Sequence, residues 1–319
     1  MGAASAQAHR CRRGSGRDER PWARLYQLGG TGGTVVLVSQ AGVCPRWAIW
    51  SSIVIVTTIN VNGIRAACKE RSTENLGMLA WLKETRADVI CMQEVRCDDD
   101  QLATTMEPAI ADGWHLASAS SDRKGRNGVA VLSRTPLDAV RIGCGAEEFE
   151  AHGRWIEVDT AGITVASVYV PTGEAQTERQ LEKERFLDAV AARMAQLRAG
   201  DREALVCGDW NIGHTENDIK NWKGNVKKAG FLPEERQWVS DLLGTGWVDA
   251  VRSVHGDVPG PYSWWSWRGK AFDNDAGWRI DYHLVTSGLA QRAVTGGTER
   301  PGAYALRWSD HAPVTVEFS

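Results

Sequence analysis

Acid and amide side chains recur where the apolar runs of this sequence end. In chain order they are Asn60, Asn62, Glu94, Asp209, Asn211, Asp281 and Asp310, with His311 directly after the last. Each one alone is typical of a turn, but their repetition at successive strand ends indicates a shared site. Residues two apart in extended backbone point the same way, so Asn60 with Asn62 can face one pocket, as can Asp209 with Asn211. Carboxylate and amide oxygens suit Mg²⁺, whereas the sequence has no thiolate or histidine cluster suited to Zn²⁺.

Positive charge is gathered in segments next to these groups. The formal net charge is −3, and the first fifty residues hold seven Arg against Asp18 and Glu19, which leaves −8 for the rest. An acidic body argues against general electrostatic binding of nucleic acid. A run of charge alone is typical of a solvated face, but cations and amides that adjoin the candidate site suit phosphate contacts. They are Arg65, Arg123, Lys124, Arg126, Lys220, Asn221, Lys223, Asn225, Lys227 and Lys228.

Hydrophobic periodicity predicts the elements that must position these residues. Strands are expected over residues 53–59, 89–92, 128–132, 155–158, 163–170, 204–207, 262–266, 279–285 and 314–318. Helices are expected over residues 72–86, 177–198 and 233–243. Many strands with a few long helices are typical of an α/β fold with two packed sheets and helices outside, here in one domain over residues 53–319.

Residues 1–52 differ from the rest of the chain. They are rich in Gly, Ala, Ser and Arg without a sustained period, so we expect a disordered extension or upstream sequence from a misassigned start. No run of 18 apolar residues occurs in the chain, and no membrane span is expected. The seven cysteines are scattered without a CxxC pair, which indicates reduced thiols in a cytoplasmic protein.

Taken in order, the motifs around these residues resemble the exonuclease III family of DNA-repair nucleases, which includes abasic-site (AP) endonucleases. They are Thr58-Ile-Asn-Val-Asn-Gly-Ile-Arg-Ala, Gln93-Glu94, Tyr169-Val-Pro-Thr-Gly173, Gly208-Asp-Trp-Asn211, Trp278-Arg-Ile-Asp281 and Ser309-Asp-His-Ala-Pro313. The resemblance covers about residues 53–319. It implies a four-layer α/β sandwich, in which two packed mixed β-sheets are flanked by helices.

The resemblance also implies a role for each site residue. A Mg²⁺ ion, for which Mn²⁺ can substitute, would be held by Asn62 and Glu94 with help from Asp310. Asp209, Asn211 and His311 are implied as further metal-site residues, with Asn60 as support. Asp209 would deprotonate the attacking water, and Asn211 would hold that water or the phosphate. Tyr169 and His311 would contact the phosphate, with Asp281 bonded to the other imidazole nitrogen. Some relatives have Asp where this chain has Asn62, which here removes one formal charge from the site.

The segment Tyr262-Ser-Trp-Trp-Ser-Trp267 concentrates three of the chain's 15 tryptophans. Strand alternation would send Trp265 and Trp267 to one face, where packing is expected, and Trp264 to the other. The resemblance implies that Trp264 and Trp278 line a small pocket for a base-free sugar. The implied DNA contacts are Arg65, Arg126, Asn221, Asn225, Lys227, Trp264 and Trp278.

The expected function is Mg²⁺-dependent incision of double-stranded DNA at abasic sites by a monomer, with 3′→5′ exonuclease and 3′-phosphatase activity. The alternative is a general DNase or another phosphoesterase of the same superfamily, which would share Asp-x-Asn and Ser-Asp-His. Such a relative would not be expected to have residues 217–231 as they stand, or Trp278-Arg-Ile-Asp281. A non-catalytic DNA-binding relative would have lost at least one catalytic residue, and all of them are present.

Overall fold

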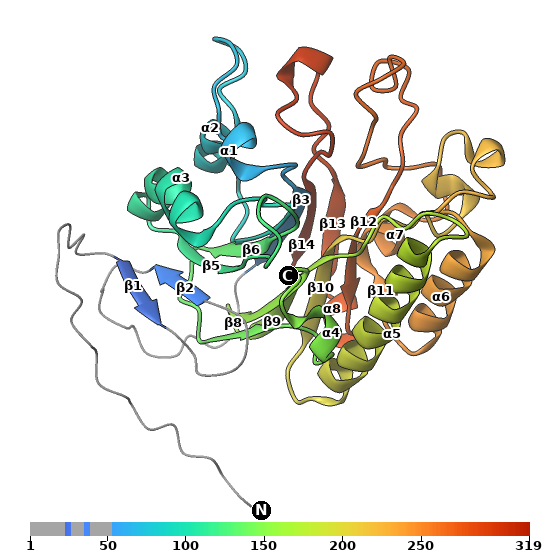
Figure 1. Cartoon of the computed structure of the whole chain (residues 1–319), viewed down its shortest axis with the longest axis horizontal. Helices are drawn as coiled ribbons and strands as arrows, with labels where there is room; N and C mark the ends of the chain where they lie inside the picture. The colour runs from blue at the N-terminus through green and yellow to red at the C-terminus, as the bar shows by residue number, and fades with distance from the viewer. Residues whose placement is uncertain (1–22, 27–34, 39–52) are drawn as a thin grey trace, which may run out of the picture.

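The strands of this computed structural model, which describes residues 23–26, 35–38 and 53–319, form two mixed sheets (Figure 1). In spatial order, the eight-stranded sheet contains β1 (Ala23–Tyr26), β2 (Val35–Val38), β5 (His115–Ala119), β6 (Val129–Ser133), β4 (Val89–Gln93), β3 (Val54–Asn60), β14 (Val314–Phe318) and β13 (Ala293–Thr298). The six-stranded sheet contains β11 (Val248–Asp249), β12 (Asp281–Val285), β10 (Ala204–Asp209), β9 (Ile163–Tyr169), β8 (Trp155–Thr160) and β7 (Ala139–Ile142).

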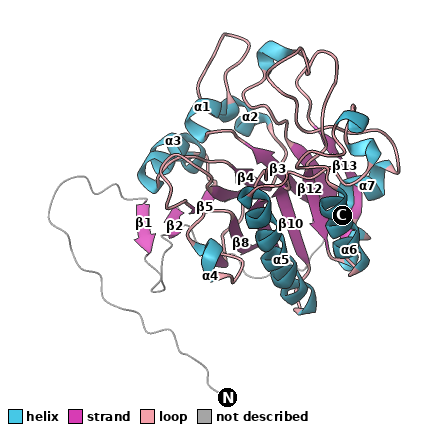
Figure 2. Ribbon diagram, turned by 45° about the vertical axis from the view of Figure 1, so that its right-hand side comes forward, coloured by secondary structure: helices cyan, strands magenta, loops and turns pink. Residues whose placement is uncertain are grey.

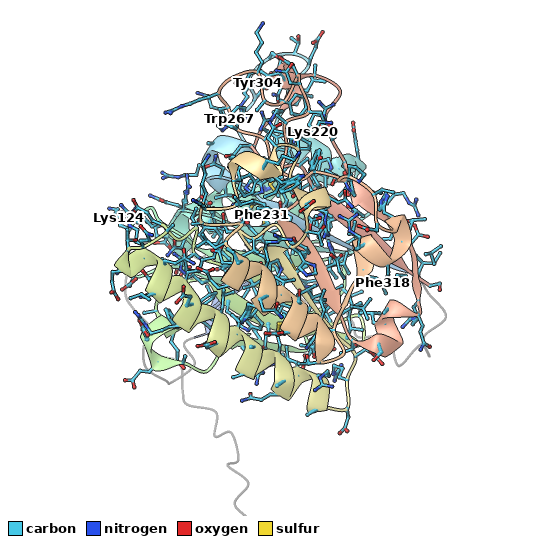
Figure 3. All side chains as sticks on the ribbon, turned by 90° about the vertical axis from the view of Figure 1, so that its right-hand side faces the viewer. Lys124, Lys220, Phe231, Trp267, Tyr304 and Phe318 are labelled. Carbon is cyan, nitrogen blue, oxygen red and sulfur yellow. The ribbon has the colours of Figure 1, made fainter. Side chains whose placement is uncertain are left out.

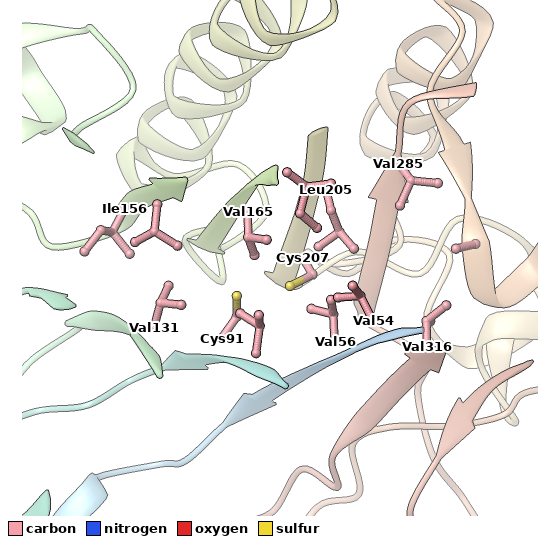
Figure 4. Close-up of a cluster of buried hydrophobic side chains, with 14 of the residues drawn as sticks. Val54, Val56, Cys91, Val131, Ile156, Val165, Leu205, Cys207, Val285 and Val316 are labelled. Carbon is pink, nitrogen blue, oxygen red and sulfur yellow. The ribbon is translucent and has the colours of Figure 1, made fainter. Parts of the chain in front are cut away.

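The two sheets pack face to face through one apolar layer (Figure 4). In β3, Val54 and Val56 point into this layer, whereas Ile55 and Ile59 point to the outer face of the same sheet. The side chains of this one strand thus pack into two separate hydrophobic cores, because successive residues of a strand point to opposite faces of the sheet. The strand is buried along its whole length, which explains its continuous apolar and threonine-rich sequence.

Helices cover the outer face of each sheet (Figures 1 and 2). The eight-stranded sheet is covered by α1 (Ile64–Ala67), α2 (Met78–Glu84) and α3 (Asp99–Ala111). The six-stranded sheet is covered by α5 (Glu178–Ala199) and α6 (Pro233–Gly244). The shorter helices are α4 (Glu147–Glu150), α7 (Ala250–His255) and α8 (Ser287–Ala290). The predicted four-layer sandwich is therefore confirmed.

The helix predicted over residues 72–86 begins only at Met78, which corrects its start by six residues. Ser72 accepts hydrogen bonds from the backbone N–H of Asn75 through both its carbonyl and its hydroxyl, and this local turn replaces the first helical turn. The Asn75 side chain then donates to the carbonyl of Ala305 at 2.7 Å, so a distant loop stabilises the turn.

The strand predicted over residues 262–266 is also wrong. Its backbone forms only isolated bridges, from Trp264 to Trp278 and to His311. Several elements were not predicted, among them α3, which contains Pro108, and the strands β5, β7 and β13. Strand β13 has the sequence AVTGGT and exposes Val294, so it lacks the buried alternation that reveals a strand.

Two strands lie within the range for which a disordered extension was predicted. β1 pairs with β2, and β2 adjoins β5 through Val38 and Leu116. The rest of residues 1–52 lies outside the described residues. No helix in the described ranges is both long and apolar enough to cross a membrane.

Strand direction brings the candidate residues to one edge of the sandwich. β3 and β4 run parallel, with Asn60 beside Gln93, so Asn60 and Glu94 lie at the ends of neighbouring strands on the same edge of the sheet. β9 and β10 are parallel too, and Asp209 lies beside Tyr169 on one side and Asp281 of β12 on the other. Gly208 allows the close approach of β10 to β9, because a Cβ there would lie 1.9 Å from the carbonyl oxygen of Val168.

Replacement of Gly208 by alanine should therefore destabilise the protein by at least about 4 kcal/mol, since the neighbouring strand has to move. Gly113→Ala is the matched control, because Gly113 has a positive φ of 95° but no heavy atom within 4 Å of an added Cβ. That variant should lose only about 1–2 kcal/mol, the cost of the left-handed backbone. Urea denaturation of both variants measures the difference in the free energy of unfolding. Equal losses of stability would show that the close contact between β10 and β9 does not require glycine at position 208.

Candidate active site

The side chain of Asn60 connects the two sheets at the site. Its Nδ2 donates to Oε1 of Glu94 and to Oδ2 of Asp209, each at 2.9 Å, and its Oδ1 accepts from the backbone N–H of Asn62 at 2.9 Å. The amide is fully buried, and both of its N–H groups are used by carboxylates. Asn60 therefore fixes the relative position of a carboxylate from each sheet.

Asp209 is held from three directions. Besides Asn60, its Oδ1 accepts from the backbone N–H of Asn211 at 2.9 Å and its Oδ2 accepts from Asn211 Nδ2 at 3.2 Å. Burial raises the pKa of Asp209 to about 7, although the nearby His311 opposes this shift. A carboxylate with a pKa near neutrality can accept a proton from a reacting group and release it again.

His311 and Asp281 form the second part of the site. The Nδ1 atom of His311 lies 2.8 Å from Oδ2 of Asp281, and its Nε2 lies 3.8 Å from Oδ2 of Asp209. Burial lowers the pKa of His311, but the charges of Asp281 and Asp209 outweigh it and raise the pKa to about 9. The ring is therefore an imidazolium at neutral pH, a cation next to the carboxylate of Asp209.

Ser309 fixes the segment that carries this histidine. Its hydroxyl donates to the carbonyl of Asn60 at 2.6 Å and accepts from the backbone N–H of His311 at 3.2 Å. The Ser-Asp-His sequence is thus attached to the end of β3 by a buried side chain.

The predicted metal ligands Asn62, Glu94 and Asp310 lie together on the other side of Asn60. Asn62 Nδ2 donates to Oδ1 of Asp310 at 2.7 Å, and Trp264 Nε1 donates to its Oδ2 at 3.1 Å. Within the described part of the chain, no three Asp, Glu, His or Cys side chains converge as a ready-made ligand set. Two carboxylates and one amide oxygen suit Mg²⁺, which usually keeps several waters and takes one or two carboxylates.

A basic cavity of about 450 Å³ opens beside Glu94 and Tyr169. Its cations are Arg96, Arg123, Arg126, Arg154 and Arg179. Burial, helped by the charge of Asp209, raises the pKa of Tyr169, so its hydroxyl stays a neutral donor. The structure thus brings the predicted Tyr169 and Arg126 to one cavity, which suits an anion.

A second basic cavity of about 510 Å³ is lined by Asn221, Asn225, Trp222 and three lysines, which are Lys220, Lys223 and Lys228. Asn225 Nδ2 donates to the carbonyl of Asn221 at 2.9 Å, which stabilises the loop. Lys227 lines a separate cavity beside α5, and Arg65 is exposed on α1. Of the loop residues predicted to touch DNA, the structure therefore groups Asn221 with Asn225 but places Lys227 apart from them.

Trp264 and Trp278, which were predicted to line a pocket for a base-free sugar, lie next to each other. Their rings are perpendicular with centroids 6.2 Å apart, and Trp278 lies so close to Gly230 that an added Cβ would be 3.2 Å from its ring. Trp265 is buried against Phe272, which confirms its packing role. The packing role predicted for Trp267 is wrong.

Trp267 is 42% exposed and lies beside Tyr304 at the tip of the molecule (Figure 3). The rule of strand alternation fails at this position because the segment from Tyr262 to Trp267 does not form a strand.

Arg279 is a positioning residue that the sequence analysis missed. It is buried, and it donates to Asp218 at 2.6 Å and to Asp249 at 2.7 Å. The other carboxylate oxygen of Asp218 accepts from the backbone N–H groups of His214 and Thr215. Arg279 thereby attaches the loop after Asn211 to the strand that follows Trp278. Its place inside the motif Trp278-Arg-Ile-Asp281 was the available signal.

Lys183 was missed as well. Its fully buried Nζ donates to the carbonyls of Thr172 and Asn211, at 3.3 and 3.0 Å, and to Oε1 of Glu235 at 2.7 Å. The second oxygen of Glu235 accepts from the backbone N–H groups of Gly230 and Leu232. One ion pair therefore connects three loops of the site. Lys183 falls on the inner stripe of α5, where only apolar residues were sought.

Lys183→Met should destabilise the protein by about 3–5 kcal/mol, because it leaves the Glu235 carboxylate buried without a counter-charge. Arg185→Met on the same helix is the control, since the Arg185–Glu148 pair is exposed and should contribute little. Denaturant unfolding of both variants tests this contrast. A Lys183→Met protein as stable as Arg185→Met would mean that Glu235 is satisfied by other partners.

Comparison with known proteins adds independent information. The model of the endonuclease/exonuclease/phosphatase family matches residues 57–311 of this chain. An exodeoxyribonuclease of Bacillus subtilis is 34% identical over 257 residues, which cover 81% of this chain and 96% of that protein. A DNA repair nuclease of Danio rerio is 32% identical over 262 residues, which cover 82% of this chain and 81% of that protein.

Solved structures agree with these sequence matches. An AP endonuclease from Archaeoglobus fulgidus superposes with a TM-score of 0.74 at 28% identity, over 83% of this chain and 99% of that one. A 3′ phosphatase from Neisseria, solved bound to a product DNA hairpin, superposes with a TM-score of 0.73 at 28% identity and the same coverage.

Proposed function

The chain belongs to the endonuclease/exonuclease/phosphatase family, and we propose that it is a Mg²⁺-dependent nuclease that incises duplex DNA at abasic sites. We include 3′→5′ exonuclease and 3′-phosphatase activity in the proposal, because these reactions hydrolyse differently presented phosphates at one site. The observation that carries it is the arrangement of Asp209 between Asn60, Asn211 and the imidazolium of His311. That arrangement suits in-line attack of water on a phosphodiester.

Asp209 would accept the proton of the attacking water. Its two amide neighbours donate to the carboxylate and fix its orientation, and its pKa of about 7 suits a general base at neutral pH. The charge that develops on the phosphate needs preorganised donors. His311 Nε2–H and the neutral Tyr169 hydroxyl are donors that the chain offers there. The two hydrogens of Asn211 Nδ2 are used by Asp209 and by the carbonyl of Val170, so this amide orients the base.

Asn62, Glu94 and Asp310 would hold the metal. Their oxygens form a hard donor set of low charge, which fits Mg²⁺ and also Mn²⁺. A divalent ion bound there supplies Lewis-acid stabilisation of the phosphate charge. Asn60 supports this set from behind through its hydrogen bond to Glu94.

The two basic cavities suggest how the DNA is held. One contains Arg126 beside Tyr169 and the other contains Asn221 and Asn225, so the phosphate backbone can be contacted at both. The Trp264–Trp278 pair, linked to the site by the hydrogen bond from Trp264 to Asp310, would form the pocket for a flipped sugar without a base.

The central test uses a labelled duplex with one abasic analogue, compared with undamaged 3′-recessed DNA. We expect incision at the analogue only with Mg²⁺ or Mn²⁺, and loss of activity in excess chelator. Asp209→Asn should slow turnover by about 10²-fold or more while the protein stays folded, whereas Arg185→Met should not. Full activity in excess EDTA, or near-normal turnover of Asp209→Asn, would refute the mechanism.

Substrate choice is tested separately at the tryptophans. Trp278→Ala should weaken or relax abasic incision and leave hydrolysis of a minimal phosphodiester nearly unchanged, because only the sugar pocket is altered. Trp265→Ala is the comparison, since loss of this core ring costs about 3–5 kcal/mol and should lower the melting temperature and all activities together. If Trp278→Ala behaves like Trp265→Ala, Trp278 is a core residue and the abasic-site assignment loses its basis.

A further inference from the structure

The guanidinium of Arg96 lies between two of the proposed metal ligands. Its Nη1 donates to Oδ1 of Asn62 at 2.6 Å, and its Nη2 forms an ion pair with Oε2 of Glu94. Asn62 thereby presents its Nδ2 to Asp310. The guanidinium thus occupies the place where the oxygens of Asn62 and Glu94 converge, which is where a cation bound by both would lie.

The backbone of this segment is anchored independently of the Arg96 side chain. The backbone N–H of Arg96 donates to the carbonyl of Asn127 at 2.8 Å, and that of Val95 donates to the carbonyl of Gly128 at 3.0 Å. The Arg96 side chain itself is 42% exposed and lines the 450 Å³ basic cavity. The guanidinium can therefore turn from the ligands into the cavity without moving Glu94.

An arginine cannot remove this conflict by losing its proton. A guanidinium and a divalent ion that share two ligand oxygens would lie within a few ångströms of each other, where like charges repel strongly. Each can occupy the position only when the other is absent. Without either, the Glu94 carboxylate would stand near Asp209 and Asp310 without a counter-charge.

We propose that Arg96 is an exchangeable internal cation, which neutralises the metal site in the metal-free protein and must leave it when Mg²⁺ binds. The proposal rests on the metal site of the proposed function. It makes Arg96 a positioning residue that lowers the affinity for the metal. The neutral Asn62, which stands where some relatives have Asp, would lower that affinity as well. The displaced guanidinium would join the cavity proposed for DNA phosphate, so binding of metal and of DNA would favour each other.

The test measures metal binding rather than activity. The metal-free full-length chain is titrated with Mn²⁺, and free Mn²⁺ is followed by electron paramagnetic resonance. Arg96→Met should bind Mn²⁺ at least about fivefold more tightly than the unchanged protein, the lower end of typical coupling between two ligands. Arg96→Lys should fall between them, because an ammonium keeps the charge but cannot bridge two oxygens as a planar fork does.

Arg126→Met is the matched control. It removes one positive charge from the same cavity, so it reports the general electrostatic effect without the ligand contacts of Arg96. The melting temperature provides a second readout, because Arg96→Met should be less stable than the unchanged protein without metal and recover in excess Mg²⁺.

The proposal is wrong if Arg96→Met binds Mn²⁺ no more tightly than Arg126→Met, or more weakly, since Arg96 would then be a bystander or a support for the ligands. That result would leave the proposed function intact as long as the unchanged protein binds the metal. Absence of Mn²⁺ binding by every protein tested would overturn the proposed metal site and this inference together.

Discussion

One side-chain amide holds the two halves of the site in register. Asn60 ends a strand of the eight-stranded sheet, and its two N–H groups reach Glu94 in the same sheet and Asp209 in the other. A carboxylate at this position would repel both partners, and an apolar side chain would leave two buried carboxylates without a donor. The distance between the sheets, set by the apolar layer behind the site, therefore decides whether the proposed metal ligands and the proposed base can act on one phosphate.

Buried ion pairs fix the positions of the loops around the site, as Asn60 fixes the relative positions of the strand ends. Loops at the edge of a sandwich would ordinarily be mobile, but Lys183 binds two of their carbonyls and Arg279 binds Asp218, which holds a third loop segment. Such charges are costly to bury unless each is paired and hydrogen-bonded, and both conditions are met here. The result is a set of loops with fixed backbone positions around Asn211 and Trp278.

The distribution of charge also favours the binding of an anion at the site. The body of the chain is acidic, yet cations gather in two cavities, one of them beside Glu94 and Tyr169, so attraction of a polyanion is local rather than general. Among the site residues, most of the carboxylates have a cation beside them. His311 and Arg96 compensate Asp209, Asp281 and Glu94, while Asp310 is satisfied by the neutral donors Asn62 and Trp264.

The sequence by itself determined the fold class, most of the strands and the identity of the residues gathered at the strand ends. It could do so because buried strands have a continuous apolar pattern, and because the motifs around Asn60, Glu94, Asp209 and His311 are local in the chain. It misjudged the segment from Tyr262 to Trp267, where alternation holds only if a strand forms, and the start of α2, where Ser72 makes a turn instead.

Only the tertiary structure decided how these groups act on one another. The bond from Asn60 to Asp209 joins residues 149 positions apart, and that from Asn62 to Asp310 joins residues 248 positions apart. Nor does any local pattern indicate that Lys183 faces three loops or that Arg96 lies among the proposed metal ligands. Such contacts depend on where the packing of two sheets and their helices places distant side chains, and short-range periodicity carries no information about that.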